Sequence, residues 1–546
     1  MRQGSNRRLA NVKTRTETGF EYVKQSLDLM TPFAKTNLKE AKPFFPGEEE
    51  ELRHELDRVE EMMQFVAAHE RQVGQMQEIF MCMKDLSYSI KRCRESTLSV
   101  VELFEIKSQL LEMTNIRRFC TEAGEVPEEL VPLDVTDALD ILDPKKDRLN
   151  TFYIYNEFSE KLGELRKVKH DYEVKIRRAQ KARKEEIRKE YGILLTPKFD
   201  VILARGSEEL EKAKQIGDLE QISEDYNSVT FQLGKTDEIY ELDKEMDGII
   251  VSIEEEEQRV REELSTAIGR HEEVLLENCR RIGELEVSLA KAVYGIRHNC
   301  VKPEIVEEHI LVFEEGRHLQ VEEILGAKGK TYHPISISLE DGVTCITGAN
   351  MGGKTISLKL AGLIPMLAQY GFFVPCRKAK IGLSNYMQIL IGDSQSVERG
   401  LSSFGSEMEE LKEILDRSQD RSLILIDEIA SGTNPVEGLA LTKSLIDYLR
   451  EKPYISLITT HFDAVKEEPD VVNMQVRGLA NADFRKLDSE LRRANRRERI
   501  NIISKYMDYS LYKVTGNREI PRDALNIARM LGLNEEIIEG AKKYIK

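Results

Sequence analysis

The chain has 546 residues, more than one hydrophobic core accommodates, which predicts two to four domains. Its 97 Asp and Glu against 80 Lys and Arg give a formal charge of −17, which disfavours nonspecific nucleic-acid binding by the whole surface and leaves room for a local basic patch. Seven scattered cysteines without a CxxC pair indicate reduced thiols, and the lack of a signal-like or membrane-spanning run predicts a cytoplasmic protein without a membrane partner.

The first 300 residues predict a helical domain. Glycine and proline are sparse there, and apolar residues recur at helical spacing. We expect one long helix over 156–191, stopped by Gly192, and a second over 243–296, about 75 Å long at 1.5 Å per residue. Together they would form an antiparallel helical arm. The segment 193–238 between them has strand-like runs such as FDVILA and VTFQL, which predict a small tip domain.

The first of these helices is strongly basic. Eleven Lys and Arg stand against four Asp and Glu over 166–189, and such a helix could follow the phosphates of DNA. The candidate DNA contacts are Arg177, Arg178, Lys181, Arg183 and Lys184. A solvated face of an ordinary charged helix is the alternative interpretation. A second basic cluster, RRANRRER at 492–499, fits a surface loop or helix of the following domain.

From residue 301 to 546, alternating strands and helices predict a layered α/β domain with a mainly parallel sheet. Short apolar runs at 343–347, 422–426 and 454–459 suit strands buried on both faces. Chemistry is expected at the C-terminal ends of such strands.

The sequence GANMGGKT follows the first of these strands and opens a predicted helix, in the pattern GxxxxGK[ST]. Backbone N–H groups and the helix N-terminus would hold phosphates, Lys354 would reach the terminal phosphates, and Thr355 would hold Mg²⁺. The expected nucleotide contacts are Gly348, Ala349, Asn350, Met351, Gly352, Gly353, Lys354 and Thr355. The pattern therefore predicts a nucleoside triphosphate and Mg²⁺ as cofactors.

Two further motifs complete a nucleotide-hydrolysing site. Asp427 and Glu428 end the second strand, which places one carboxylate beside the metal and another where it can orient or deprotonate water. His461, at the end of the third strand, is close enough by topology to sense the terminal phosphate. We therefore expect catalytic roles for Glu428 and His461 and a metal-ordering role for Asp427.

Five ordered motifs resemble the MutS family of DNA mismatch-repair ATPases. They are TGANMGGKT, LAQYGFFVPC, LSSFGSEM, LIDEIASGTNPVEGLAL and TTHFD, within residues 316–461. A weaker likeness at 27–62 is similar to the start of the family's helical lever domain. The resemblance implies an α + α/β multidomain fold: a helical lever over 1–300 with a clamp at 193–238, then an ABC-type P-loop ATPase domain over 301–546 with a C-terminal helical dimerisation segment.

The resemblance also implies a homodimer. Ser402 matches the family serine that contacts the γ-phosphate bound by the other subunit, although a plain helix N-cap is the alternative. Residues 431–433 would line the same interface. Within the family, the chain resembles the branch that lacks mismatch-reading domains, and we expect neither a mismatch-reading domain nor a nuclease module. The family's adenine-stacking aromatic has Tyr332 as its candidate.

Two function classes remain open. The first is a dimeric ATPase that binds mismatched, branched or other unusual DNA in repair or recombination. The second is an ATP-driven protein remodeller, similar to the MutS-like component that works with a small partner subunit on the cobalamin enzyme lysine 5,6-aminomutase. The motifs support the shared ATPase and do not separate the two.

Overall fold

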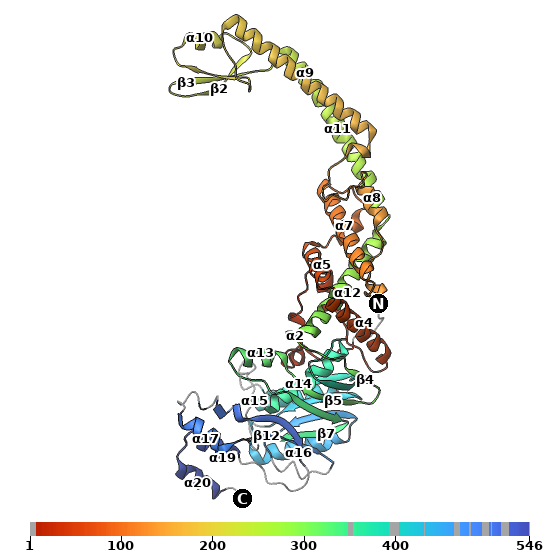
Figure 1. Cartoon of the computed structure of the whole chain (residues 1–546), viewed down its shortest axis with the longest axis vertical. Helices are drawn as coiled ribbons and strands as arrows, with labels where there is room; N and C mark the ends of the chain where they lie inside the picture. Colours follow the sequence, from red (N-terminus) through yellow and green to blue (C-terminus); the bar gives the residue numbers. More distant parts are fainter. Residues whose placement is uncertain are drawn as a thin grey trace. The chain divides into compact units, whose positions relative to one another are not determined.

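The computed structural model describes residues 7–347, 353–392, 403–430, 432–462, 470–479, 482–493, 499, 502–503, 505–514 and 523–544. Helices and strands are mixed and fall into two compact units (Figure 1). Unit 1 comprises Met1–Cys82, Phe119–Val131 and Arg280–Lys546, and unit 2 comprises Met83–Arg118 and Pro132–Cys279. The first 82 residues thus group with the C-terminal half. The expected bounds of 1–300, 193–238 and 301–546 stay a prediction.

A six-stranded sheet lies at the centre of unit 1, in the order β13-β12-β7-β11-β10-β9. All neighbouring strands are parallel except β12 and β13, which confirms the mainly parallel sheet. The three strands expected from the sequence are β7, β10 and β11, each within one residue of its expected bounds. The strands are β7 Gly342–Thr347, β9 Tyr386–Ile391, β10 Ser422–Asp427, β11 Tyr454–Thr459, β12 Val472–Gly478 and β13 Asp508–Lys513.

Both faces of this sheet are apolar and covered by helices. Side chains alternate along β10: Leu423 and Leu425 join the cluster that contains α14, whereas Ile424 and Ile426 join the cluster that contains α16. This two-sided burial explains why the strands are continuous apolar runs. The helices of the sheet region and those that follow it are α14 Gly353–Gln369, α15 Ser403–Arg417, α16 Pro435–Arg450, α17 Phe484–Arg493, α19 Asp523–Met530 and α20 Glu535–Lys542.

A second, four-stranded sheet in unit 1 has the order β4-β8-β5-β6 and was not expected from the sequence. Its strands are β4 Glu304–Val306, β5 Ile310–Gly316, β6 Ile335–Glu340 and β8 Lys378–Gly382, with α13 Leu319–Ala327 between β5 and β6. Buried and exposed residues alternate strictly in β6, as in a strand with one solvated face. Leu311, Phe313 and Ile337 of this sheet share a core cluster with α14.

The N-terminal segment covers the outer edge of β9. The Leu9 carbonyl accepts a hydrogen bond from the Met387 N–H at 2.7 Å, and the Thr14 hydroxyl donates to Gln388 Oε1 at 2.6 Å. An edge strand protected in this way does not offer its backbone groups to another chain. The N-terminal helices are α1 Val12–Glu17, α2 Phe20–Gln25, α3 Pro32–Glu40, α4 Glu49–Ala68 and α5 Glu70–Cys82.

Unit 2 is built on two long helices, α9 and α11, which lie side by side (Figure 1). The helix expected over 156–191 is confirmed as α9, Glu160–Tyr191, with Gly192 in the left-handed region at its end (φ +71°). It begins four residues late because Asn156–Phe158 forms a 3₁₀ turn and the Ser159 hydroxyl caps the helix. The shorter helices of this region are α6 Ser87–Arg92, α7 Val100–Ala123 and α8 Thr136–Leu142.

The single helix expected over 243–296 is wrong. The chain instead forms α11, Asp237–Gly269, and α12, Glu272–Arg297. Arg94 Nε donates to the Gly269 carbonyl at 2.9 Å, and a Cβ at Gly269 would lie only 2.9 Å from Arg94 Cγ. The Arg94 side chain thus satisfies a carbonyl group at the end of α11, where the chain turns. The turn is short, so the apolar period continues across it and conceals the break.

The tip of unit 2 is a three-stranded antiparallel sheet of order β1-β3-β2, with α10 Glu208–Lys214. Its strands are β1 Asp200–Ala204, β2 Leu219–Glu224 and β3 Ser228–Leu233, so the strand-like runs in the sequence are confirmed. Leu203, Leu210 and Phe231 share a small core with Ile187 near the end of α9. Across the described residues, no helix is both long enough and apolar enough to cross a membrane.

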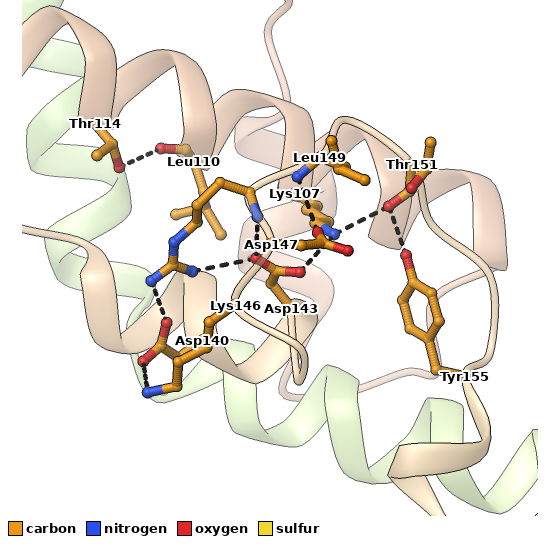
Figure 2. Close-up of polar contacts among 11 residues, drawn as sticks. Lys107, Leu110, Thr114, Asp140, Asp143, Lys146, Asp147, Leu149, Thr151 and Tyr155 are labelled. Carbon is orange, nitrogen blue, oxygen red and sulfur yellow. Dashed lines mark hydrogen bonds and ion pairs between the residues drawn. The ribbon is translucent and has the colours of Figure 1, made fainter.

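A buried ion pair joins α7 to the segment after α8 (Figure 2). Lys107 Nζ lies 3.1 Å from Asp143 Oδ1 and donates to the Thr151 carbonyl at 3.0 Å, and both charged side chains are almost fully buried. Burial alone would raise the pKa of Asp143, but hydrogen bonds from the Arg148 N–H and from Lys107 hold it below its ordinary value. Ionised Asp143 therefore stabilises the fold at pH values above the ordinary carboxyl pKa. This stabilisation is lost as the pH falls through the lowered pKa of Asp143 in the folded protein.

Lys107→Met would leave Asp143 buried without its main cation. We expect the free energy of local opening to fall by about 3–5 kcal/mol, measured by hydrogen exchange of the α7 and α8 amides. Lys146→Met is the control, because the Lys146 side chain is 65% exposed and pairs with Asp140 at the surface, and about 0–1 kcal/mol is expected there. An equal decrease in the free energy of local opening in the two variants would contradict a stabilising role for the buried ion pair of Lys107 with Asp143.

Candidate functional site

The candidate site lies where β7, β11 and β10 end. In the sheet register, Thr459 of β11 is paired with Asp427 of β10 on one side and with Ile346 of β7 on the other. Because the three strands are parallel, their carboxyl ends meet at one edge of the sheet. The motifs that the sequence separates by about a hundred residues are thereby brought together.

The phosphate-loop motif is described from its last glycine onward, because 348–352 lie outside the described residues. Helix α14 begins at Gly353, so Lys354 and Thr355 stand in its first turn. Lys354 is only 4% exposed, and its Nζ lies 2.6 Å from Glu428 Oε1. A buried ammonium needs an anionic partner, and the first turn of a helix adds further attraction for anions.

Asp427 receives two hydroxyl hydrogen bonds. Thr355 Oγ1 donates to Asp427 Oδ2 at 2.7 Å, and Thr459 Oγ1 donates to Asp427 Oδ1 at 2.5 Å. The carboxylate is therefore fixed in direction by both neighbours. Thr355 and Asp427 together present hard oxygen atoms, the ligand type that Mg²⁺ prefers.

Thr459 was missed by the sequence analysis, although it holds both acidic residues. Besides binding Asp427, it accepts the Glu428 N–H at 3.1 Å through its carbonyl and at 3.1 Å through its hydroxyl. Glu428 has a positive φ of 51°, which non-glycine residues adopt only where their surroundings enforce it. The signal available in the sequence was a hydroxyl residue two positions before His461.

The structure describes His461 and only some of the residues expected at the subunit interface. The His461 side chain is exposed, follows β11, and has its ring centroid 4.6 Å from that of Phe462. Ser402 and Ser431 lie outside the described residues, whereas Gly432 is exposed and Thr433 is half-buried beside the start of α16. The expected roles of these residues stay predictions.

Tyr332 is engaged elsewhere in unit 1. Its hydroxyl accepts the His318 N–H at 3.1 Å, and burial raises its pKa to about 12. Another aromatic pair lies next to the phosphate-loop helix: the His333 and Tyr509 ring centroids are 5.7 Å apart, and Tyr509 Cδ1 lies 3.1 Å from where a Cβ of Gly353 would be. This pair was not anticipated, because neither residue belongs to a recognised motif.

The candidate DNA contacts on α9 fall into two groups. Arg183 Nε donates to Asp218 at 2.7 Å and Lys184 Nζ to the Thr196 carbonyl at 2.9 Å, so both bind the tip of unit 2. Arg177, Arg178 and Lys181 are exposed and form no ion pair with any residue that the structure describes. Only this second group is available to an external anion.

Residues 344–546 match the family model "MutS domain V". The part of the chain that carries this site is thus similar to a domain of the MutS family. Endonuclease MutS2 of Caldanaerobacter subterraneus subsp. tengcongensis is 30% identical over 309 residues, covering 56% of this chain and 36% of that protein. Endonuclease MutS2 of Fusobacterium nucleatum is 34% identical over 298 residues (53% and 35%), and that of Clostridium tetani is 32% identical over 314 residues (56% and 36%). The matches thus span about a third of these curated MutS2 relatives.

Thr459→Val tests whether this hydroxyl holds the site together. The substitution keeps the shape but leaves Asp427 without one donor, so we expect the free energy of unfolding to fall by roughly 1–3 kcal/mol in chemical denaturation. Ser456→Ala in the same strand is the control, because the Ser456 hydroxyl is buried and has no partner among the described residues. The free energy of unfolding of Ser456→Ala should be unchanged or slightly higher. A larger decrease for Ser456→Ala than for Thr459→Val would refute the role assigned to the Thr459 hydroxyl.

Proposed function

We propose that this protein is a member of the MutS family, that it binds and hydrolyses ATP with Mg²⁺, and that it acts as a homodimer on mismatched, branched or other unusual DNA in repair or recombination. The observation that carries the ATPase assignment is the pairing of Lys354 with Glu428 and of Thr355 with Asp427 at one sheet edge. A buried lysine, a magnesium-type oxygen pair and a second carboxylate are the groups that phosphoryl transfer to water requires.

The residues present fit the implied cofactors. Bound Mg²⁺ would neutralise charge on the phosphates and would be held by Thr355 and Asp427. Lys354, whose counter-charge in this structure is Glu428, would turn to the terminal phosphates. Glu428 would then be released to orient a water molecule and take its proton. The rings of His333 and Tyr509 offer adenine an aromatic surface beside the first turn of α14.

The dimer is proposed from the family pattern. Ser402 would contact the γ-phosphate bound by the partner subunit, and 431–433 would line the same interface. His461 would sense that phosphate from the end of β11. In this arrangement each subunit completes the other's site, so ATP binding favours the closed dimer.

The proposed DNA surface is one face of α9. Its exposed cations without a described partner are Lys167, Arg177, Arg178, Lys181 and Lys189. At about 100° per residue, these five fall within about 120° of the helix circumference. They extend over about 33 Å, close to one turn of B-form DNA. Asp171 and Glu185 share this face, and the salt bridge of Glu185 to Arg188 at 3.6 Å lowers its effective charge.

Glu428→Gln tests the proposed ATP hydrolysis and the proposed dimer together. The amide keeps the shape but cannot accept the water proton, so we expect ATP binding to persist and kcat to fall by roughly 10²- to 10⁴-fold. The ATP-bound variant should accumulate as a dimer in light scattering. Lys354→Ala is the comparison and should lose nucleotide binding itself. A variant at Glu428 that turns over ATP like the wild type, or that stays monomeric with ATP, would contradict the proposal.

Replacing Arg177, Arg178 and Lys181 with Ala tests the DNA surface. We expect the slope of log affinity for branched DNA against log salt to fall by roughly 2 to 3, because each neutralised phosphate contributes about 0.9. DNA stimulation of ATP turnover should fall with it. The matched control replaces Lys198, Lys212 and Lys214 of the tip with Ala, the same change in charge away from this face. An unchanged slope, or no DNA response in the wild type at about 0.15 M salt, would favour a protein client.

A further inference from the structure

The loop after β10 is held in an unusual conformation. Glu428 and Ala430 both have positive φ, 51° and 58°, although neither is glycine. The loop is also tightly packed, because a Cβ on Gly438 of α16 would lie 2.9 Å from the Ala430 carbonyl oxygen. Strained residues persist only where several neighbours over-determine their position. Thr459 supplies one such restraint at Glu428, and the other must act on Ala430.

Glu407 of α15 supplies that second restraint. Its two carboxylate oxygens lie 3.3 and 3.2 Å from the Ala430 N–H, which they both accept. Glu407 is 9% exposed, and burial raises its pKa. A carboxylate is costly to bury, and this backbone N–H is its one hydrogen-bond partner in the part of the chain that the structure describes. Core stability alone would be served better by an apolar side chain at this position.

We propose that Glu407 is a positioning residue for ATP hydrolysis, which holds the loop that carries Glu428 by accepting the Ala430 N–H. The proposal rests on the ATPase function proposed above.

The test compares Glu407→Ala, Glu407→Gln and Glu409→Ala in the full chain. Without its acceptor the loop is released, and displacement of a catalytic group by about 1 Å costs up to about 100-fold, so kcat of Glu407→Ala should fall by roughly 10- to 100-fold. The KM and the affinity for a fluorescent ATP analogue should stay within about threefold, since Lys354 and Thr355 are untouched. Gln retains an acceptor oxygen and should restore kcat to within about threefold.

Glu409→Ala removes an exposed carboxylate from the same helix and should leave kcat unchanged. If Glu407→Ala does not fold, Glu407→Asp replaces it, because the shorter carboxylate cannot reach Ala430 and should lower kcat in the same way. Wild-type kcat in Glu407→Ala, a parallel loss of ATP affinity, or failure of Gln to restore turnover would each overturn the inference. A wild-type chain that binds or hydrolyses no ATP would instead refute the proposed function.

Discussion

The register between β7, β11 and β10 is the constraint on which the candidate site depends. These strands are apolar on both faces, so a slip by one residue would exchange Leu425 for Ile426 against the helices at little hydrophobic cost. The polar contacts at the strand ends are not interchangeable in this way. Thr459 meets both Asp427 and the Glu428 N–H only in the observed register, and the Thr460 N–H donates to the Ile346 carbonyl at 3.0 Å. The residues proposed for chemistry thus also specify how the sheet is assembled.

The ion pair of Lys354 with Glu428 gives the site an internal counter-charge. With Lys354 4% exposed, its ammonium could not stay charged and unpaired without a large desolvation cost. Under the proposed function, phosphates and Glu428 compete for the same cation, and the polyanionic phosphates release the carboxylate as they bind. The hydrolytic group is then available only when nucleotide is present, and the restraints from Thr459 and Glu407 keep its backbone in place during the exchange.

The sequence was sufficient where a local pattern determines the structure. Strand ends, the Gly192 stop and the convergence of Lys354, Asp427 and Glu428 all followed from short-range motifs. The sequence did not predict features that involve contacts with residues far away in the chain. At the break after Gly269 the carbonyl is bound by Arg94, some 175 positions away, and the contacts of Thr459 and Glu407 are made to residues on other strands and loops. The continuous apolar runs that predicted the central strands do not occur in β6, where buried and exposed residues alternate, or in β4, which has only three residues, so the second sheet was not predicted.

The two long helices of unit 2, α9 and α11, carry opposite charge, which would limit how nucleic acid is held under the proposed function. Helix α9 has 12 Lys and Arg against 7 Asp and Glu, whereas α11 has 3 against 12, so the pair sums to 15 against 19. The tip, over 193–236, has 5 against 8 and adds no attraction. At physiological salt, charges are screened beyond about 8 Å, so a phosphate at the α9 face is affected mainly by the cations next to it. Affinity for DNA would therefore come from close contacts on one helix face, without long-range steering, and raising the salt would weaken it readily.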